Sequence, residues 1–342
     1  MTRLAVAGVG AISPAGVGVS TLAEATTLGR CVAAGPISET NVAVLKKIRR
    51  SAAITLYAAT AVEEALRDCG VSGFADCALI SGVTNGALNF SADFHHTLVT
   101  EAKETASPTL FSESVLNAPA GNASIIFNIR GPVYSIIGGQ SIAIKALMLA
   151  ATLIETRRAQ RAIVVCAEER NELSSFCYSR FNPKAARVFS EGAGALLIEP
   201  VDERRPINPV ELCTITGYAA YTIPGSPHLA LQRAIDGALS MADLEAADIG
   251  VAVSDYKTAT LFREIPTLSF SDCLGYAFCV STMWNIILAA MACGGGCPVN
   301  PLFAAGLKKY AKHSEINHVI IYAAEEDGDA SAIILSRVGA SS

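Results

Sequence analysis

The stretch GPVYSIIGGQSIA, at residues 131–143, predicts the central feature of the fold. A strand-like run ends at Gly138 and Gly139, and an apolar helix is predicted over about residues 141–154. Because glycine lets the backbone turn sharply, the two glycines predict an elbow between the strand and the helix. Such an elbow places one side chain beside the free N–H groups of the helix, where a Cys or Ser nucleophile is expected. The elbow residue here is Gln140, whose amide is neither a nucleophile nor an acid or base near pH 7.

The composition bounds the size of the core and the kinds of partner. The chain has 342 residues, of which 51% are hydrophobic and only 17% are charged. These proportions predict one large domain or two of ordinary size, with a large core or a sizeable surface covered by a partner. The net charge of −5 and the lack of a long basic block indicate that nucleic acid is not a partner.

Cysteines, histidines and apolar segments predict a cytoplasmic protein without a metal or cofactor. The 10 cysteines are scattered through apolar segments without a CxxC pair, which predicts buried, reduced thiols, and no signal peptide precedes the first strand. Residues 273–307 carry no charge, but they contain polar side chains and a glycine triplet, so a buried central helix over about residues 280–292 is expected rather than a membrane span. The adjacent His95 and His96 would point about 100° apart on a helix, which makes them a poor metal pair.

The order of predicted elements repeats between the two halves of the chain. Residues 164–169 (VVCAEE) and 321–326 (IYAAEE) each end a predicted strand, and each is followed by a loop and a final strand. The polar segment DERRP at residues 202–206 is the predicted boundary, which divides the chain into halves at 1–205 and 206–342. Alternating strands and helices in two similar halves predict an α/β fold of two packed sheets, with helices between and outside them.

Four further motifs follow one another along the chain. They read VAGVGAISP at residues 6–14, NAPAGN followed by RGP at 117–132, EGAGA at 191–195 and CPVNP at 297–301. In this order they resemble the first strand, the segment before the nucleophile, the Asp-Gly-Ala-Gly turn and the exit from the core helix of the β-ketoacyl synthases. The resemblance covers nearly the whole chain, and it implies the thiolase-like fold, in which two pseudo-repeated halves form an αβαβα layered arrangement.

The same resemblance implies that the catalytic positions of the family are replaced in this chain. In the family an elbow Cys carries the acyl chain, while two His residues and a Lys support decarboxylation and condensation. The Cys position corresponds to Gln140, and the Lys position corresponds to Ser271. The two His positions correspond to Tyr256 and Tyr276, and the glycine-rich gating loop corresponds to the acidic residues 325–329 (EEDGD).

An elbow Gln occurs in two settings within the family: a decarboxylating loading synthase that keeps both His residues, and the chain length factor of type II polyketide synthases. Because both His positions are Tyr here, the resemblance implies a non-catalytic chain length factor, of an aryl polyene, other polyene or aromatic system. The implied partners are an active β-ketoacyl synthase subunit, in a heterodimer, and an acyl carrier protein with a phosphopantetheine-bound acyl chain. Two alternatives stay open: a malonyl-carrier decarboxylase that uses Gln140, Tyr256 and Tyr276, and a purely structural or carrier-docking subunit.

The resemblance also implies which residues lie near the partner. Leu110 and Phe111 are expected where the chain crosses toward the partner's pocket, and there they would help to set the length of the product. Thr84 and Asn85 are expected to face the same region, and ordinary packing is the alternative for all four residues. The strand of the elbow motif is expected to pair antiparallel with its counterpart in the partner through Val133, Tyr134, Ser135, Ile136 and Ile137.

Overall fold

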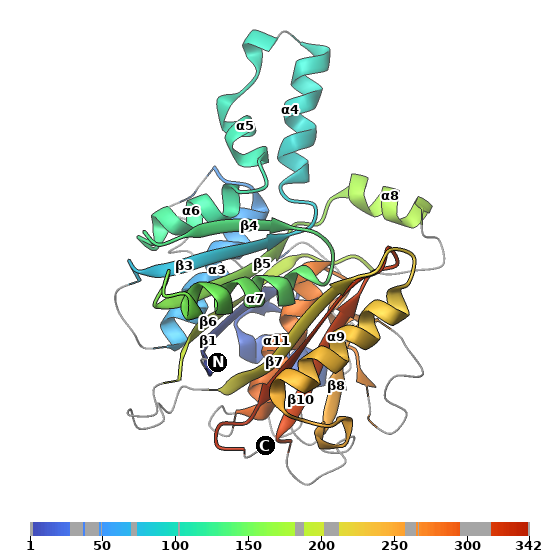
Figure 1. Ribbon diagram of the computed structural model, residues 1–342. Coiled ribbons are helices and arrows are strands. Elements are labelled where there is room, and N and C mark those ends of the chain that lie inside the picture. The colour runs from blue at the N-terminus through green and yellow to red at the C-terminus, as the bar shows by residue number, and fades with distance from the viewer. Residues whose placement is uncertain are drawn as a thin grey trace.

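The computed structural model describes residues 3–27, 37, 48, 50–69, 74–101, 103–181, 188–201, 212–256, 265, 267–294 and 316–340 of the chain, in which strands and helices alternate (Figure 1). Up to residue 201 the elements are β1 (Leu4–Ser13), β2 (Gly16–Val17), α1 (Val19–Thr27), α3 (Ala53–Asp68), β3 (Cys77–Val83), α4 (Leu88–Thr100), η1 (Lys103–Thr105), α5 (Pro108–Ser114), α6 (Ala118–Ile126), β4 (Val133–Ile137), α7 (Ile142–Glu155), β5 (Arg161–Glu168), α8 (Glu172–Phe181) and β6 (Gly192–Pro200). From residue 212 they are β7 (Cys213–Thr222), α9 (Pro227–Ala242), η2 (Ala246–Asp248), β8 (Val251–Val253), β9 (Thr267–Leu268), α10 (Ser271–Leu274), α11 (Cys279–Cys293), β10 (His318–Ala324) and β11 (Asp329–Ser336).

The strand order confirms the predicted repeat. The strands follow the order β4-β3-β5-β6-β1-β7-β11-β10-β8-β9, and β2 pairs with β1. In the first half β3 is parallel to β4 and β5, while β6 is antiparallel to β5 and β1. In the second half β8 is parallel to β9 and β10, while β11 is antiparallel to β10 and β7. The two half-sheets thus share one order and one set of directions, and the predicted boundary between residues 205 and 206 lies outside the described residues.

The prediction of two separate sheets is wrong in one respect. Leu4, Ala5 and Val6 of β1 pair antiparallel with Ile215, Thr214 and Cys213 of β7, so the two half-sheets form one continuous sheet. Buried backbone N–H and C=O groups must find hydrogen-bond partners, and this pairing supplies them at what would otherwise be two buried edges.

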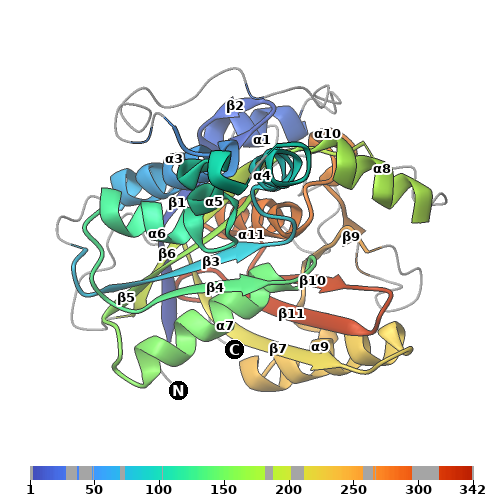
Figure 2. The same cartoon turned by 90° about the horizontal axis from the view of Figure 1, so that it is seen from above.

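Helices separate and cover the two half-sheets in five layers (Figures 1 and 2). α7 and α11 contact each other and lie between the half-sheets, where each contacts strands of both. α3 and α6 cover the outer face of the first half-sheet, and α9 covers the outer face of the second. The three largest clusters of buried hydrophobic side chains correspond to the three interfaces that these layers create. The predicted αβαβα arrangement is confirmed.

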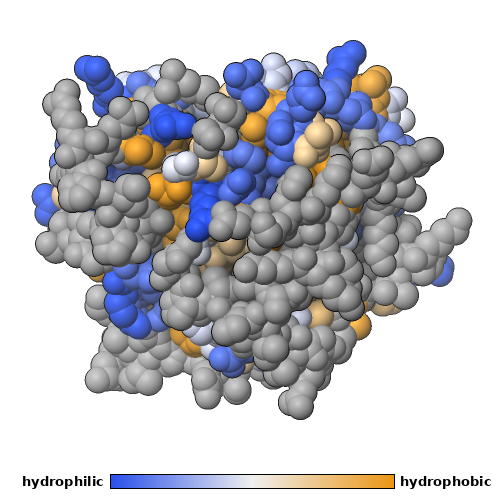
Figure 3. All heavy atoms as spheres, turned by 90° about the horizontal axis from the view of Figure 1, so that it is seen from below, coloured by the Kyte–Doolittle hydropathy of each residue, from blue (hydrophilic) through white to orange (hydrophobic). Residues whose placement is uncertain are grey.

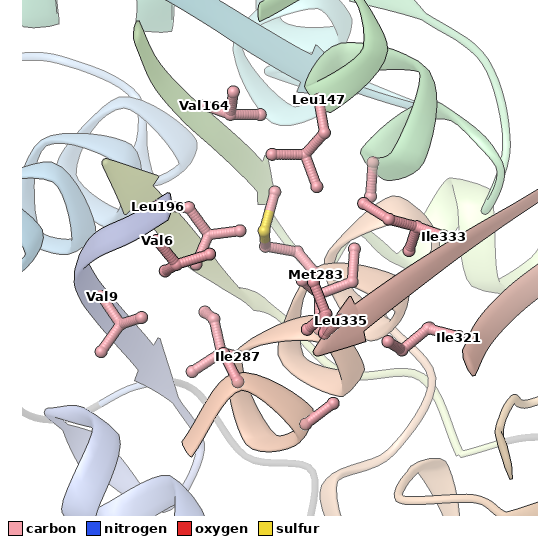
Figure 4. Packing of buried hydrophobic residues seen from close by; sticks show 14 of the residues in the cluster. Val6, Val9, Leu147, Val164, Leu196, Met283, Ile287, Ile321, Ile333 and Leu335 are labelled. Carbon is pink, nitrogen blue, oxygen red and sulfur yellow. The ribbon is translucent and has the colours of Figure 1, made fainter. Parts of the chain in front are cut away.

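The uncharged segment contains the buried central helix α11, as predicted. Figure 4 shows Met283 and Ile287 of this helix among side chains from both half-sheets and from α7. Its polar side chains have partners: Trp284 Nε1 donates to the Ala193 carbonyl at 3.1 Å, and Asn285 Nδ2 donates to Asp255 Oδ2 at 3.1 Å. Internal hydrogen bonds therefore allow a helix with polar residues to lie in the middle of the protein. Within the described residues, no helix has both the length and the apolar character needed to cross a bilayer.

Candidate functional site

The elbow forms as the sequence predicts. β4 ends at Ile137, α7 begins at Ile142, and Gln140 lies buried between them with an exposed fraction of 4%. A Cβ at position 139 would overlap the carboxylate of Glu325, so a larger residue there would require the Glu325 side chain to move. The Glu325 side chain therefore packs directly against the backbone of the elbow.

Two internal partners occupy the polar groups of Gln140. Its backbone N–H donates a hydrogen bond to the carboxylate of Glu325, which follows β10 directly. Its side-chain Nε2 donates to the Tyr276 hydroxyl at 2.9 Å. The structure therefore joins Gln140 and Tyr276, two of the four positions predicted to be degenerate, and it places a carboxylate at the N-terminal end of α7, which the helix dipole favours.

The acidic loop of residues 325–329 is anchored to α7. Asp329 accepts hydrogen bonds from Ser141 Oγ, from Lys145 Nζ and, at 2.8 Å, from Thr222 Oγ1. Burial by itself would raise the pKa of Asp329, but these three donors and the Lys145 charge hold that pKa below its ordinary value. The Glu325 N–H also donates to the Asp329 carbonyl at 2.8 Å, so the anchored loop holds Glu325 against Gln140.

A second buried carboxylate occupies the equivalent place in the first half. Glu168 is the last residue of β5, the strand that corresponds to β10, which Glu325 follows directly. The Glu168 carboxylate accepts hydrogen bonds from the backbone N–H groups of Thr84 and Asn85. The Cys279 thiol, at the first residue of α11, lies 3.8 Å from Glu168 Oε1. Each central helix therefore has a glutamate from the same position of the repeat beside its N-terminal end. Burial raises the pKa of Glu168 to about 7 despite these donors.

Both carboxylates belong to one polar cluster. Burial first, and then the charges of Glu168 and Glu325, raise the pKa of the Tyr178 hydroxyl, which therefore lies near both groups. Burial, with Cys166 and Glu168 nearby, raises the pKa of the Cys279 thiol well above its ordinary value. A thiol held protonated is a poor nucleophile, so Cys279 does not replace the missing elbow Cys.

Aromatic rings form the wall beside Gln140. Phe278 stacks on Phe189 with ring centres 5.7 Å apart, and it lies 5.0 Å from Tyr276 and 4.8 Å from Tyr178. Phe278 has a φ of +52°, an uncommon backbone conformation for a bulky residue, and directly precedes α11. The rings run from the half-exposed Tyr178 on α8 to Tyr276, and they close this side of the elbow with apolar surface.

Tyr256 and Ser271, the other two positions predicted to be degenerate, lie in different surroundings. The Tyr256 ring is 6.1 Å from the His228 ring and packs against the hydrophobic cluster beneath α9. Ser271 belongs to a network around the buried Asp255, which accepts its N–H at 3.3 Å and the Ser269 hydroxyl at 2.7 Å. Tyr256 therefore packs in the outer layer, whereas Tyr276 reaches Gln140.

The residues predicted to lie near the partner's pocket do not lie together in the structure. Leu110 and Phe111 lie on α5, which with α4 forms a hairpin that projects from the body of the protein (Figure 1). Phe111 is 56% exposed, and its ring lies 5.4 Å from that of Phe94 on α4. Thr84 and Asn85 instead lie between β3 and α4 in the chain, and their backbone N–H groups donate hydrogen bonds to the Glu168 carboxylate.

The elbow strand β4 is the first strand in the order of the described sheet, so one of its edges has no neighbouring strand there. Val133 and Ile137 at its two ends are exposed, whereas Tyr134 and Ile136 pack against the central core. Ser135 pairs with Ser81 of β3 on its inner edge. Among the described residues, no group of three His, Cys, Asp or Glu side chains is placed to hold a metal ion.

Comparison with known proteins supports the resemblance seen in the sequence. Residues 72–205 match the family model described as the β-ketoacyl synthase N-terminal domain. The curated 3-oxoacyl-[acyl-carrier-protein] synthase 2 of Rhizobium meliloti (strain 1021) is 26% identical over an alignment of 247 residues, and the match covers 63% of this chain and 58% of that relative. The chain thus matches less than two thirds of the relative's length.

Solved structures align with nearly the whole length of this chain. The ishigamide ketosynthase/chain length factor aligns with a TM-score of 0.79 and 20% identity, over 98% of this chain and 100% of that chain. The chain has the thiolase-like fold of the β-ketoacyl synthases. AntDE:AntF, a type II PKS acyl-carrier protein in complex with its ketosynthase bound to the hexaketide, aligns with a TM-score of 0.79 and 19% identity, over 98% and 99% of the two chains.

This site contains two buried or half-buried glutamates, of which only Glu325 lies in a segment that the sequence analysis singled out, as part of the acidic residues 325–329. Glu168 and Glu325 come from the repeated Ala-Glu-Glu at residues 167–169 and 324–326, which was read as evidence for two similar halves. The repeat was the available signal for Glu168, but it does not show that both carboxylates lie beside the ends of the central helices.

The Glu168 carboxyl predicts a pH dependence of folding stability. Its pKa of about 7 in the folded protein lies above the ordinary 4.5, so the native state binds more protons than the unfolded chain between these values. The free energy of unfolding is expected to fall as the pH rises through this window, with a contribution of up to ~1.4 kcal/mol per pH unit. Glu168→Gln should lose this contribution, as measured by urea denaturation at several pH values. Exposed Glu172→Gln on α8 should keep the wild-type slope, and equal slopes in all three proteins would contradict the prediction.

Glu325 should suppress a thiol that is restored at the elbow. In Gln140→Cys, the carboxylate raises the thiol pKa and occupies the N–H that would stabilise the thiolate. Alkylation of the introduced thiol by iodoacetamide is expected to be roughly tenfold slower in this variant than in Gln140→Cys/Glu325→Gln. Peptide mass spectrometry measures both rates, with the half-buried Cys177 as an internal reference. Equal rates would show that Glu325 does not control the elbow.

Proposed function

We propose that this chain is a non-catalytic chain length factor, which forms a heterodimer with an active β-ketoacyl synthase subunit and shapes the tunnel for the growing acyl chain. The observation that carries the proposal is the elbow itself, where Gln140 replaces a nucleophile and its N–H binds Glu325. An acyl carrier protein would deliver chains to the partner's Cys in the cytoplasm. Condensation would take place on the partner, in a polyketide system of the aryl polyene, other polyene or aromatic type.

The chemistry of the elbow argues against catalysis by this chain. Covalent catalysis needs a nucleophile, and an amide does not supply one. Stabilisation of an oxyanion needs N–H donors directed at the position where the charge develops. Here the carboxylate of Glu325 already accepts the N–H of Gln140, and its charge would repel an enolate or a tetrahedral oxyanion.

The exposed edge of β4 and the projecting hairpin support an assembled role. An edge strand presents unpaired N–H and C=O groups, which pair readily with a strand of another chain. We expect residues 133–137 to pair antiparallel with the equivalent strand of the synthase subunit. The hairpin would then bring Leu110 and Phe111 to the partner's pocket, and a large interface would also account for the low share of charged residues.

A decarboxylase is the second candidate function. The hydrogen bond of 2.9 Å between Gln140 Nε2 and the Tyr276 hydroxyl favours it, because both groups lie at the elbow and a Tyr can donate one hydrogen bond to a substrate. Glu325 opposes it for the electrostatic reason given above. Release of carbon dioxide from malonyl carrier protein by the isolated chain would decide in favour of the decarboxylase.

Co-expression with an active β-ketoacyl synthase subunit from the same source tests the assembly. Native mass spectrometry is expected to show a stable one-to-one complex, with acyl chains found only on the synthase subunit. Acyl transfer to this chain, or a self-paired dimer that ignores the synthase, would contradict the proposal.

Substitution of Phe111 tests the tunnel assignment. In the reconstituted complex, Phe111→Ala removes the exposed ring from α5 and is expected to lengthen the products, because it removes bulk from the end of the tunnel. Val99→Ala is the matched control, since Val99 is 82% exposed on α4 of the same hairpin. Product lengths are measured by liquid chromatography and mass spectrometry. If both variants made products of wild-type length, Phe111 would not belong to the tunnel.

A further inference from the structure

The α4–α5 hairpin projects from the body of the protein with little apolar surface to anchor it (Figure 1). Both helices lie wholly within the described residues, and Glu113 on α5 is the one buried side chain that they contain. Phe90, near the start of α4, packs only partly against the hydrophobic cluster beneath α3. The side of the molecule away from the hairpin shows alternating hydrophilic and hydrophobic patches of the described residues (Figure 3). Polar contacts at the base of the hairpin therefore contribute much of what keeps it in place.

The N-terminal end of α3 supplies the first of these contacts. Its N-cap residue is Ala52, whose side chain cannot accept a hydrogen bond. The Ala52 N–H instead donates to Glu113 Oε2 at 3.1 Å, and the Ile54 N–H donates to Glu169 Oε2 at 3.4 Å. Two carboxylates from distant parts of the sequence thus cap α3, where unpaired N–H groups and the helix dipole favour negative charge.

Glu113 connects α5 to its surroundings through both carboxylate oxygens. The Thr55 hydroxyl donates to Oε2 at 3.3 Å, and the Ser51 hydroxyl donates to Oε1 at 3.3 Å. Asn122 Nδ2, on α6, also donates to Oε1 at 3.0 Å. The start of α3 and the neighbouring helix α6 therefore hold the same carboxylate, and α5 cannot rotate without breaking these hydrogen bonds.

Glu169 connects α4 to the same end of α3. Its Oε1 accepts the Asn89 N–H at 3.0 Å and Asn89 Nδ2 at 2.9 Å, and Asn89 is the second residue of α4. Ser91 Oγ donates to the Ser114 carbonyl at 3.3 Å, which joins α4 to the end of α5. Each helix of the hairpin thus reaches the N-terminal end of α3 through one buried carboxylate.

The place of Glu113 on α5 determines where Phe111 points. Successive residues of an α-helix are rotated by about 100°, so side chains two residues apart point in nearly opposite directions. Glu113 faces the body of the protein and is 8% exposed, whereas Phe111 is 56% exposed. A rotation of α5 that released Glu113 would therefore turn Phe111 away from its present direction.

From these contacts we infer that Glu113 and Glu169 are positioning residues, which hold the α4–α5 hairpin at a fixed angle and so place Phe111 where it limits the length of the acyl chain. The anchoring of the hairpin stands on the contacts above, whereas the effect on chain length rests on the proposed function. A Gln at either position would keep one acceptor oxygen and would place an NH₂ group beside groups that are themselves donors.

Hydrogen–deuterium exchange of the full chain tests the anchoring. In Glu113→Gln and, separately, in Glu169→Gln, amides of the hairpin and of the first turn of α3 are expected to exchange at least about tenfold faster than in the wild type, because hydrogen bonds to a charged group are lost. Glu101→Gln is the matched control, since Glu101 is exposed at the end of α4 and the variant loses the same charge from the same hairpin.

The control should exchange as the wild type does. Thermal unfolding establishes that each variant is folded, and Asn89→Ala, at an exposed residue, carries the test if the glutamate variants do not fold. Wild-type exchange of the hairpin in the folded variants would overturn the inference.

The lengths of the products test the positioning role. In the reconstituted complex, Glu113→Gln is expected to give a wider range of product lengths, because Phe111 is no longer held in one place, and Glu101→Gln should give the wild-type products. A role in folding alone would lower the amount of product without changing its length. That result would overturn the positioning role if Phe111→Ala did alter the lengths. Unchanged lengths in both Glu113→Gln and Phe111→Ala would instead contradict the tunnel assignment, and the role in chain length would fall with it.

Discussion

The hydrogen bond from the Gln140 N–H to Glu325 is the interaction on which the properties of this site depend. A helix N-terminus has N–H groups without intrahelical partners and a partial positive charge, and it readily accepts an anion from outside. In this chain the anion is a side chain of the protein. The position at which a substrate oxyanion would be stabilised is therefore satisfied within the chain, whichever residue stands at the elbow.

The repeated topology explains why this arrangement occurs twice. β5 and β10 hold equivalent places in the two half-sheets. The N-terminal end of a central helix lies beside the C-terminal end of each of these strands. A glutamate at the end of either strand therefore lies beside a helix terminus, as Glu168 does for α11 and Glu325 does for α7. The anchoring of Asp329 by Lys145 adds a contact that keeps the second loop in place.

The same organisation leaves two features directed outward. The interior is filled by α7 and α11, with aromatic rings closing one side of the elbow, while β4 and the α4–α5 hairpin remain at the surface. An elbow whose polar groups are satisfied within the chain, together with an exposed strand edge, is the physical basis of the proposed role in shaping a partner's tunnel.

The sequence alone determined the features that depend on short stretches. The pattern of apolar residues predicted the strand and helix around Gly138 and Gly139, the lack of charge over residues 273–307 predicted the buried helix α11, and the similar segments at 164–169 and 321–326 predicted the repeat of the two halves. That Gln140, and not a Cys or Ser, stands at the elbow was also evident. Only the tertiary structure decided that β1 and β7 join the half-sheets, and that Glu325 binds Gln140 across 185 residues of sequence. It also separated the environments of Tyr256 and Tyr276, because contacts of that range depend on how the layers stack, which no local pattern encodes.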